Sequence, residues 1–388
     1  MRPEPHRSAG APARGGADAG TRAPWRTQLR RAARSLDELR ARFFPGMEIT
    51  PGMREAERRF PVAVTEHYAS LVERPDFSDP VFRQCVPSGD ELIPAPWASR
   101  DPLAEERCSP MPRLVRRYPD RAVLLACDAC ACRCRHCFRK RVSARGGPAI
   151  SDAELAAAAD WLRANPRVED VLVSGGDPLV LPDARVAAIL ASLRSVPSVR
   201  VVRIATRLPA TLPARFTPGL VRLLAGARRR GGPAVFVSCH FNHPRELAPA
   251  ALAACARLVD AGIPVQNQAV LLRGVNDDPA TMEALCRALY RNRIRPYYLF
   301  QADLAEGTEH LRTPLATGLA IMARLRASLS GPAIPNFCLD PPGRAGKIEL
   351  APASVVRRAR GATTLRAGDG ALFRYPDPRR FATSEPLC

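Results

Sequence analysis

The sequence predicts an α/β protein built on a parallel sheet that is open or closed into a partial barrel. From about residue 111 to residue 330, six strand–helix units follow one another, which is the pattern of a parallel sheet with helical connections. The chain has 388 residues, enough for one large domain with appendages or for two domains. Its hydrophobic fraction of 46% is typical of globular proteins.

The regions outside the repeating pattern differ in composition. We expect residues 1–25 to be disordered, because they are rich in Ala, Gly, Pro and Arg and lack hydrophobic periodicity. Residues 26–110 should form an N-terminal helical region broken by Pro-rich loops, with residues 26–43 as one helical stretch. Residues 111–330 should form the partial barrel and residues 331–388 a C-terminal segment.

The elements of the barrel follow from short apolar runs and helical periodicity. The expected strands span residues 122–127, 168–176, 199–206, 234–241, 263–272 and 295–301. The expected helices between them span residues 151–165, 183–195, 217–229, 247–262 and 278–292. Ser151 should cap the first of these helices, with Glu154 completing a capping box. In such barrels the chemistry lies on loops that follow the C-terminal ends of the strands.

The charge and composition narrow the class of protein. The formal charge is +20, but the excess is spread along the chain, so we favour a protein that does not bind nucleic acid over a basic nucleic-acid-binding one. We find no apolar run long enough for a membrane span and no apolar core of a secretory signal at the N-terminus. Twelve cysteines, several of them clustered, indicate a reduced, cytoplasmic protein with a metal or cluster site.

Five cysteines lie close together after the first expected strand: Cys127, Cys130, Cys132, Cys134 and Cys137. Two C-x2-C pairs, beginning at Cys127 and Cys134, could hold zinc, although zinc ribbons usually separate such pairs by a longer loop. The same two pairs could hold a closed Fe–S cluster for electron transfer. Alternatively, C-x3-C-x2-C from Cys130 to Cys137 would leave one iron of a [4Fe–4S] cluster open to a substrate or cofactor.

This C-x3-C-x2-C loop resembles the signature of radical S-adenosylmethionine (SAM) enzymes, which leaves Cys127 and Cys132 as spare thiols. A second match follows the next strand, at Ser174, Gly175, Gly176 and Asp177. Taken alone, this stretch is an ordinary turn after a strand, in which glycines allow close backbone approach. In radical SAM barrels the equivalent Gly-Gly-acidic stretch holds the amino group of SAM.

Only two of the 58 basic residues are lysines, Lys140 and Lys347. Lys347 follows Gly343 and Gly346 in "LDPPGRAGKIEL". A lysine in a loop is most often a surface cation. A lysine retained where arginine is otherwise preferred, in a Gly-rich loop, instead suits a Schiff base with pyridoxal phosphate (PLP).

Together these stretches resemble the lysine 2,3-aminomutase family, whose members use SAM, a [4Fe–4S] cluster and PLP. The resemblance covers roughly residues 90–350 and includes "SPMPRLVRRYPDRAVLL", "CRHCFRKR", "SGGDPL", "RIATRLPATLPAR", "SCHFNHPREL", "NQAVLLRGVND", "RPYYLFQADLAEGTEHLRT" and "DPPGRAGK". It implies a radical SAM barrel whose C-terminal segment carries the PLP lysine.

The resemblance also implies roles for individual residues. The cluster ligands fall on Cys130, Cys134 and Cys137, and the PLP lysine on Lys347. Candidates for the PLP phosphate are Arg117, Tyr118 and Arg121. For the substrate, Arg139 matches the arginine that takes the carboxylate, and Asp303 and Asp340 match the pair that grips the distal cation. Gln268 and Ser174 are expected near SAM, beside Gly175, Gly176 and Asp177.

The sequence departs from the family pattern in two places. Arg344 and Ala345 interrupt the Gly-rich PLP loop, which can change its conformation or its phosphate contact. The clostridial type carries a zinc site that joins a cysteine in the "VND" loop to a C-terminal cluster. Here Asp278 replaces that cysteine and Cys388 is the only cysteine after Lys347. We therefore expect no zinc, and subunit contacts that differ from those it supports in a homo-oligomer.

The implied activity is that of an isomerase, a 2,3-aminomutase that converts L-lysine to β-lysine with an electron from a flavodoxin- or ferredoxin-type reductant. Arginine, giving β-arginine, is the alternative substrate. Two other classes stay open: a PLP-independent radical SAM enzyme acting on a macromolecule, and an Fe–S electron carrier with Cys127 as fourth ligand.

Overall fold

The computed structural model describes residues 24–227, 231–342, 346–351, 355–359, 362–366 and 371–376. The expected disorder of residues 1–25 therefore lies almost entirely outside the described part of the chain. No helix within these ranges is both long and apolar enough to cross a bilayer.

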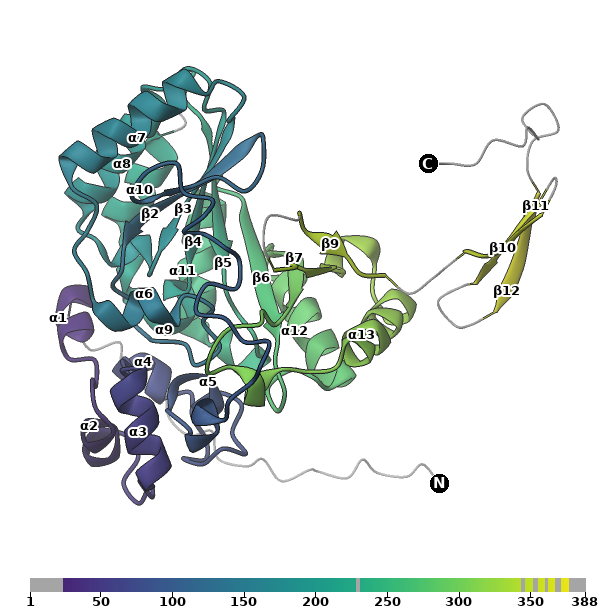
Figure 1. The fold of residues 1–388 in the computed structure, drawn as a ribbon, viewed down its shortest axis with the longest axis horizontal. Helices are drawn as coiled ribbons and strands as arrows, with labels where there is room; N and C mark the ends of the chain where they lie inside the picture. The colour runs from purple at the N-terminus through teal and green to yellow at the C-terminus, as the bar shows by residue number, and fades with distance from the viewer. Residues whose placement is uncertain are drawn as a thin grey trace, which may run out of the picture.

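A nine-stranded, mostly parallel sheet forms the centre of the described structure, with its strands in chain order (Figure 1). Neighbouring strands from β2 to β8 pair in parallel, and β1 and β9 add antiparallel edges. The strands of this sheet are β1 (Leu114–Val115), β2 (Arg121–Cys127), β3 (Asp170–Gly175), β4 (Val201–Thr206), β5 (Ala234–Cys239), β6 (Val265–Leu271), β7 (Arg295–Gln301), β8 (Asn336–Leu339) and β9 (Ile348–Glu349). The six expected strands are confirmed, and β8 extends the parallel series by one strand that we did not expect.

Helices connect the strands and cover the outside of the sheet (Figure 1). They are α6 (Lys140–Arg145), α7 (Asp152–Ala164), α8 (Asp183–Arg194), α9 (Leu208–Thr211), α10 (Pro218–Gly226), α11 (Pro249–Asp260), α12 (Pro279–Arg291) and α13 (Leu315–Ser328), with the 3-10 turns η2 (Pro178–Val180), η3 (Pro213–Arg215), η4 (Pro244–Glu246), η5 (Glu309–Leu311) and η6 (Gly331–Ala333). The predicted capping box of Ser151 and Glu154 begins α7.

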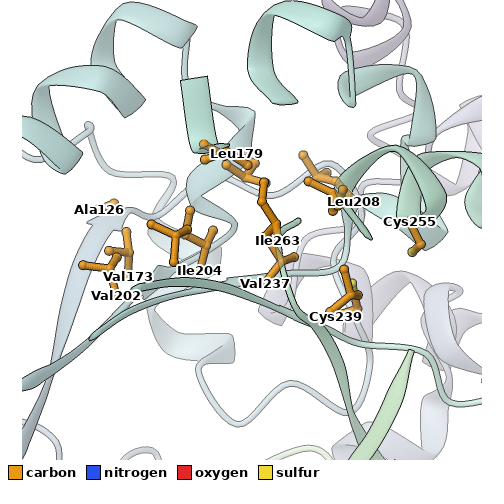
Figure 2. Close-up of a cluster of buried hydrophobic side chains, with 14 of the residues drawn as sticks. Ala126, Val173, Leu179, Val202, Ile204, Leu208, Val237, Cys239, Cys255 and Ile263 are labelled. Carbon is orange, nitrogen blue, oxygen red and sulfur yellow. The ribbon is translucent and has the colours of Figure 1, made fainter. Parts of the chain in front are cut away.

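Side chains alternate between the two faces of the sheet, as the pleat requires. On β4, Val202 and Ile204 are buried in the core under the helices, whereas Arg203 and Ala205 line a cavity on the other face. Figure 2 shows part of this core, in which the sheet contributes Ala126, Val173, Val202, Ile204, Val237 and Cys239 and the flanking segments contribute Leu179, Leu208, Cys255 and Ile263. The sheet therefore has an apolar outer face, which the helices cover, and an inner face that lines a cavity.

The N-terminal region packs around a second apolar cluster that includes Leu36, Tyr68 and Phe82. Its helices are α1 (Trp25–Arg30), α2 (Leu36–Arg42), α3 (Pro51–Arg59), α4 (Glu66–Ala69) and α5 (Phe82–Cys85), followed by the 3-10 turn η1 (Gly89–Leu92). The single helix expected over residues 26–43 is wrong, because Ser35 caps a separate α2. The break lets Ala33 form a β-bridge with Val64.

A smaller antiparallel sheet follows at the C-terminal end, apart from the nine-stranded sheet (Figure 1). Its strands are β10 (Val355–Ala359), β11 (Ala362–Arg366) and β12 (Leu372–Pro376).

Candidate active site

A cavity of about 390 Å³ lies on the inner face of the sheet. All the site residues that the sequence indicated line it: Cys130, Cys134, Cys137, Arg117, Tyr118, Arg121, Arg139, Ser174, Gly175, Gly176, Asp177, Gln268, Asp303, Asp340 and Lys347. They come from the loop after β2, from the ends of β3 and β7, from β6, and from the segments around β1, β8 and β9. Residues from segments far apart in the chain thus converge on one space.

The five clustered cysteines, from the end of β2 and the loop after it, differ in their surroundings. Cys130, Cys134 and Cys137 face the cavity. Cys127 is buried at the end of β2, where its thiol donates to the backbone carbonyl oxygen of Asp177 at 3.3 Å. Cys132 is buried against the apolar cluster of the N-terminal region, although it also borders the cavity. This arrangement supports a three-thiol site and disfavours Cys127 as a fourth ligand.

The chemistry of the three thiols fits a polynuclear cluster. Burial, with Cys137 and other neighbours adding to it, raises the pKa of Cys130 well above its usual range. Burial and Cys134 likewise raise the pKa of Cys137 to about 11. Such thiols stay protonated unless a metal replaces the proton. Within the described ranges no three Cys, His, Asp or Glu side chains group closely enough for a single metal ion. Three thiols that become thiolates on binding metal are the donor type that an Fe–S cluster requires.

Two unpaired donors beside the loop also fit a sulfide-rich group. The amide oxygen of Asn242 accepts from Val270 N–H at 2.9 Å, so its Nδ2 must donate to Nε2 of His136, 3.3 Å away. His240 Nε2 also lies 3.2 Å from His136 Nε2. Because His136 Nε2 accepts a hydrogen bond, the proton of the neutral His136 ring is on Nδ1. His136 Nδ1 and Arg207 Nε are buried without a hydrogen-bond partner among the described residues. Buried donors need acceptors, which cluster sulfides or SAM would supply.

The two glycines after β3 serve close packing against the cysteine loop. Gly175 has φ +121°, and a Cβ there would clash with the carbonyl oxygen of Cys127. A Cβ on Gly176 would clash with that of Ala129. Gly176 N–H also donates to Cys127 O at 2.6 Å. The sequence predicted that these glycines let a ligand come close to the backbone. In the structure they let the backbone of Cys127 and Ala129, which leads into the cysteine loop, come close instead.

The Asp177 carboxylate forms its hydrogen bonds mainly with other residues of the protein. Its carboxylate accepts from the Thr206 hydroxyl at 2.9 Å and from Arg207 N–H at 2.7 Å. Burial raises its pKa to about 6. Asp177 therefore ties the end of β3 to the end of β4, in addition to bordering the cavity.

Lys347 lies in a charged corner of the cavity. Its Nζ is 2.6 Å from Asp340 Oδ2, and its backbone N–H donates to the Tyr118 hydroxyl at 3.0 Å. Arg117 is 3.6 Å from the other oxygen of Asp340. Burial and the nearby Asp340 carboxylate raise the pKa of Asp303 to about 7. The corner thus gathers the predicted PLP lysine, two phosphate candidates and both substrate aspartates.

Arg139 has a partner that the sequence did not reveal. Its Nε and Nη2 bind the Glu105 carboxylate, with the shortest contact at 2.6 Å, and Nη1 donates to Ser174 Oγ at 3.1 Å. Glu105 therefore occupies the Nε–Nη2 edge of the guanidinium, and Ser174 accepts a hydrogen bond from Nη1. Glu105 lies in an irregular segment with no motif around it, so the sequence offered no signal for it.

Arg207 is the second functional candidate that the sequence analysis missed. It follows directly on β4, the position where a loop carries chemistry in such barrels, but one arginine does not stand out in a chain so rich in them. Its Nη1 donates to Cys134 Sγ at 2.7 Å.

The two predicted departures from the family pattern are only partly visible. Asp278 caps α12, accepting from Thr281 N–H at 2.8 Å. Gly343, Arg344, Ala345 and Cys388 lie outside the described residues. The expectation of no zinc and the effect of Arg344 stay predictions.

Comparisons with known proteins identify the family of the chain. The family model of the radical SAM superfamily matches residues 125–285, and that of lysine-2,3-aminomutase matches residues 322–386. The chain is 40% identical over 357 residues to the L-lysine 2,3-aminomutase of Clostridium subterminale, covering 92% of this chain and 85% of that protein. It is 38% identical to the Bacillus subtilis L-lysine 2,3-aminomutase, covering 93% of this chain and 76% of that protein.

A relative with a different named substrate also matches. The chain is 36% identical to the glutamate 2,3-aminomutase of Clostridioides difficile, covering 84% of this chain and 76% of that protein. All three relatives share the 2,3-aminomutase name and are similar to most of the chain. With a radical SAM match over the barrel and a lysine-2,3-aminomutase match over the C-terminal segment, the chain belongs to the lysine 2,3-aminomutase family of radical SAM enzymes.

Proposed function

We propose that this protein is a lysine 2,3-aminomutase, which moves the α-amino group of L-lysine to the β-carbon to give β-lysine. The observation that carries the proposal is the convergence of three residue sets on one cavity: the cysteines, Lys347 with its cationic neighbours, and the Asp303–Asp340 pair. The named relatives support the same reaction class.

Each residue set would hold one group. Cys130, Cys134 and Cys137 would hold a [4Fe–4S] cluster, which with SAM supplies a carbon-centred radical for hydrogen abstraction. Lys347 would attach PLP, which supplies an imine through which nitrogen can migrate. Arg117, Tyr118 and Arg121 are candidates to hold its phosphate, because guanidinium and phenol groups donate hydrogen bonds to phosphate oxygens.

The remaining residues orient the substrate. The Nη1–Nη2 edge of Arg139, which Glu105 does not span, would take the α-carboxylate. Asp303 and Asp340 would face the distal ammonium, because two carboxylates in one pocket are stable when a cation lies between them. A glutamate side chain would add a third negative charge there. This disfavours the substrate named for the clostridial glutamate enzyme.

The test is a product assay under anaerobic conditions. Reconstituted enzyme, SAM, PLP and dithionite would be incubated separately with lysine, arginine, ornithine and glutamate, and the products analysed for β-amino acids. β-Lysine as the main product supports the proposal. β-Arginine would keep the reaction and correct the substrate, and β-glutamate would show that the two aspartates are misplaced. No β-amino acid from any of them would favour a PLP-independent enzyme acting on a macromolecule.

A further inference from the structure

A buried arginine contacts one candidate cluster ligand directly. Arg207 Nη1 donates to Cys134 Sγ at 2.7 Å, and only 8% of the Arg207 side chain and backbone is exposed. A guanidinium stays protonated under all ordinary conditions, so this contact brings a permanent positive charge to the thiolate. Charge and hydrogen bonds at ligand sulfurs are among the factors that set the potential of an Fe–S cluster.

The other end of the same guanidinium is fixed by three side chains that lie outside the cysteine loop. Arg207 Nη2 binds Glu246 Oε1 at 2.6 Å, the Tyr68 hydroxyl at 2.7 Å and Gln84 Oε1 at 2.7 Å. Glu246 in turn accepts from the backbone N–H groups of Asn242 and His243. Three elements thus hold the guanidinium in one orientation, with Nη1 aimed at the thiol.

We propose that Arg207 sets the reduction potential of the cluster by donating a charged hydrogen bond to the Cys134 sulfur. The inference rests on the proposed function in one respect, that Cys134 is a cluster ligand. Reduction adds one electron, and hence one negative charge, to the cluster. A fixed cation beside a ligand sulfur stabilises the reduced form more than the oxidised form, so it raises the potential.

The experiment compares three proteins with reconstituted clusters: wild type, Arg207→Gln and Tyr68→Phe. Tyr68→Phe is the matched control, because it removes one hydrogen bond from Nη2 and leaves the contact between Nη1 and Cys134. A redox titration with dithionite, followed by electron paramagnetic resonance of the reduced cluster, gives each midpoint potential. We expect Arg207→Gln to lower the ratio of reduced to oxidised cluster about tenfold at a fixed potential, which is ~59 mV for one electron. Tyr68→Phe should titrate like the wild type.

A second variant guards against misfolding. Arg207→Gln leaves the buried Glu246 carboxylate without its cation, so the double variant Arg207→Gln/Glu246→Gln removes both charges together. A negative shift in both Arg207 variants, smaller in the double variant because Glu246→Gln also removes a negative charge, supports the inference. Equal potentials in wild type and in both Arg207 variants overturn it, while the proposed function stands. If neither Arg207 variant assembles a cluster, the inference is also overturned, because Arg207 would then be needed for cluster assembly. A wild type that assembles no cluster overturns the proposed function and the inference together.

Discussion

At the scale of single residues, the cavity distinguishes thiols of identical chemistry by where they lie. Cys130, Cys134 and Cys137 border the cavity, whereas the thiol of Cys127 donates to the backbone at the end of β2. Cys132 also borders the cavity, but it packs into the N-terminal apolar cluster. The spacing in the sequence allowed several ligand sets. The structure favours the set of three, because the direction of a side chain depends on the strand end and loop that carry it.

Alanine substitution of each cysteine tests this division. Cys130→Ala, Cys134→Ala and Cys137→Ala should each abolish cluster assembly, because each removes a ligand that no neighbour replaces. Cys127→Ala and Cys132→Ala should retain iron and sulfide. Iron and sulfide analysis of anaerobically reconstituted protein measures the outcome. Loss of iron in Cys127→Ala would mean a four-thiolate cluster and would contradict the radical SAM assignment of the site.

Lys347 supports a second prediction at this scale. Lys347→Arg keeps the positive charge near Asp340 but forbids attachment of PLP, because a guanidinium does not lose its proton. Borohydride treatment followed by mass spectrometry should find PLP bound covalently to the wild type and not to the variant, with the same iron content in both. PLP fixed elsewhere in the variant, or full turnover, would show that Lys347 is only a local cation.

Asp303 predicts how binding depends on pH. Its pKa is raised to about 7, so the carboxyl group is neutral below that pH and ionised above it. In the PLP-loaded enzyme the Lys347 ammonium no longer lowers this pKa, so the affinity for a cationic substrate should increase with pH up to and beyond 7, by up to about tenfold per pH unit below the pKa, and then level off. Calorimetry with lysine and unreduced, PLP-loaded enzyme measures this. Asp303→Asn should weaken binding by about 1.5–3 kcal/mol at pH 8 and remove this part of the pH dependence. The same slope in Asp303→Asn would assign it to another group.

At the scale of elements, the cysteine loop is held by a buried charge triad. Arg135 Nη2 lies 2.6 Å and Lys140 Nζ 2.7 Å from Glu91 Oε2, and Lys140 also donates to Gly307 O at 2.6 Å. Arg135 and Lys140 belong to the loop and to the start of α6, Glu91 to η1, and Gly307 to the segment after Asp303. The triad thus joins the N-terminal region, the cysteine loop and the segment after β7.

Removing the shared acid should be costly. Burial opposes ionisation of Glu91, but Arg135 and Lys140 outweigh it and lower its pKa to about 2. Glu91→Gln leaves two buried cations without their carboxylate, which should cost about 3–5 kcal/mol in urea-induced unfolding at pH 7. The wild type should lose this stabilisation as the pH falls from about 4.5 toward 2, because the carboxylate then becomes protonated. The exposed pair of Glu55 and Arg58 supplies the control, since Glu55→Gln should change stability by less than about 0.5 kcal/mol. Equal effects of the two substitutions would contradict a structural role of the triad.

The elements that the sequence predicted well are those with local causes. Short apolar runs and the Ser151 capping box define the strands and α7 without reference to the rest of the chain. The break within residues 26–43 depends on a bridge between Ala33 and Val64, which no local pattern reveals. The same holds for Glu105 and Arg207, whose partners lie far away in sequence. The site residues themselves were predictable because their motifs resemble those of a family, whereas their supporting contacts were not.

At the scale of the whole molecule, the N-terminal region and the barrel share the cysteine loop as a common boundary. Cys132 packs in the N-terminal cluster, Arg133 N–H donates to Ala63 O at 2.9 Å, and Arg135 N–H to Gln84 O at 2.9 Å. A group bound by the three cysteines would therefore stabilise both bodies at once.

Iron removal tests this coupling. A ligand that binds only the folded state stabilises it, so chelation of the cluster should lower the melting temperature of the whole protein by several degrees. The N-terminal region and barrel should still unfold in one transition when followed by circular dichroism and by tryptophan fluorescence. Cys134→Ala should melt like the chelated wild type, with or without reconstitution. Unchanged melting after chelation would place the cluster outside the cooperative structure.

The ion pair between Lys347 and Asp340 has a consequence for the order of events. While Nζ stays 2.6 Å from Asp340, the enzyme's own ammonium stands where a substrate's ammonium would be recognised. A substrate lysine must then displace the Lys347 ammonium from Asp340. Because Lys347 belongs to the same chain, its effective concentration at Asp340 is very high. Once Nζ is attached to PLP, it no longer occupies the Asp340 carboxylate. PLP would thus have to bind before lysine, and the protein without PLP should bind lysine only very weakly.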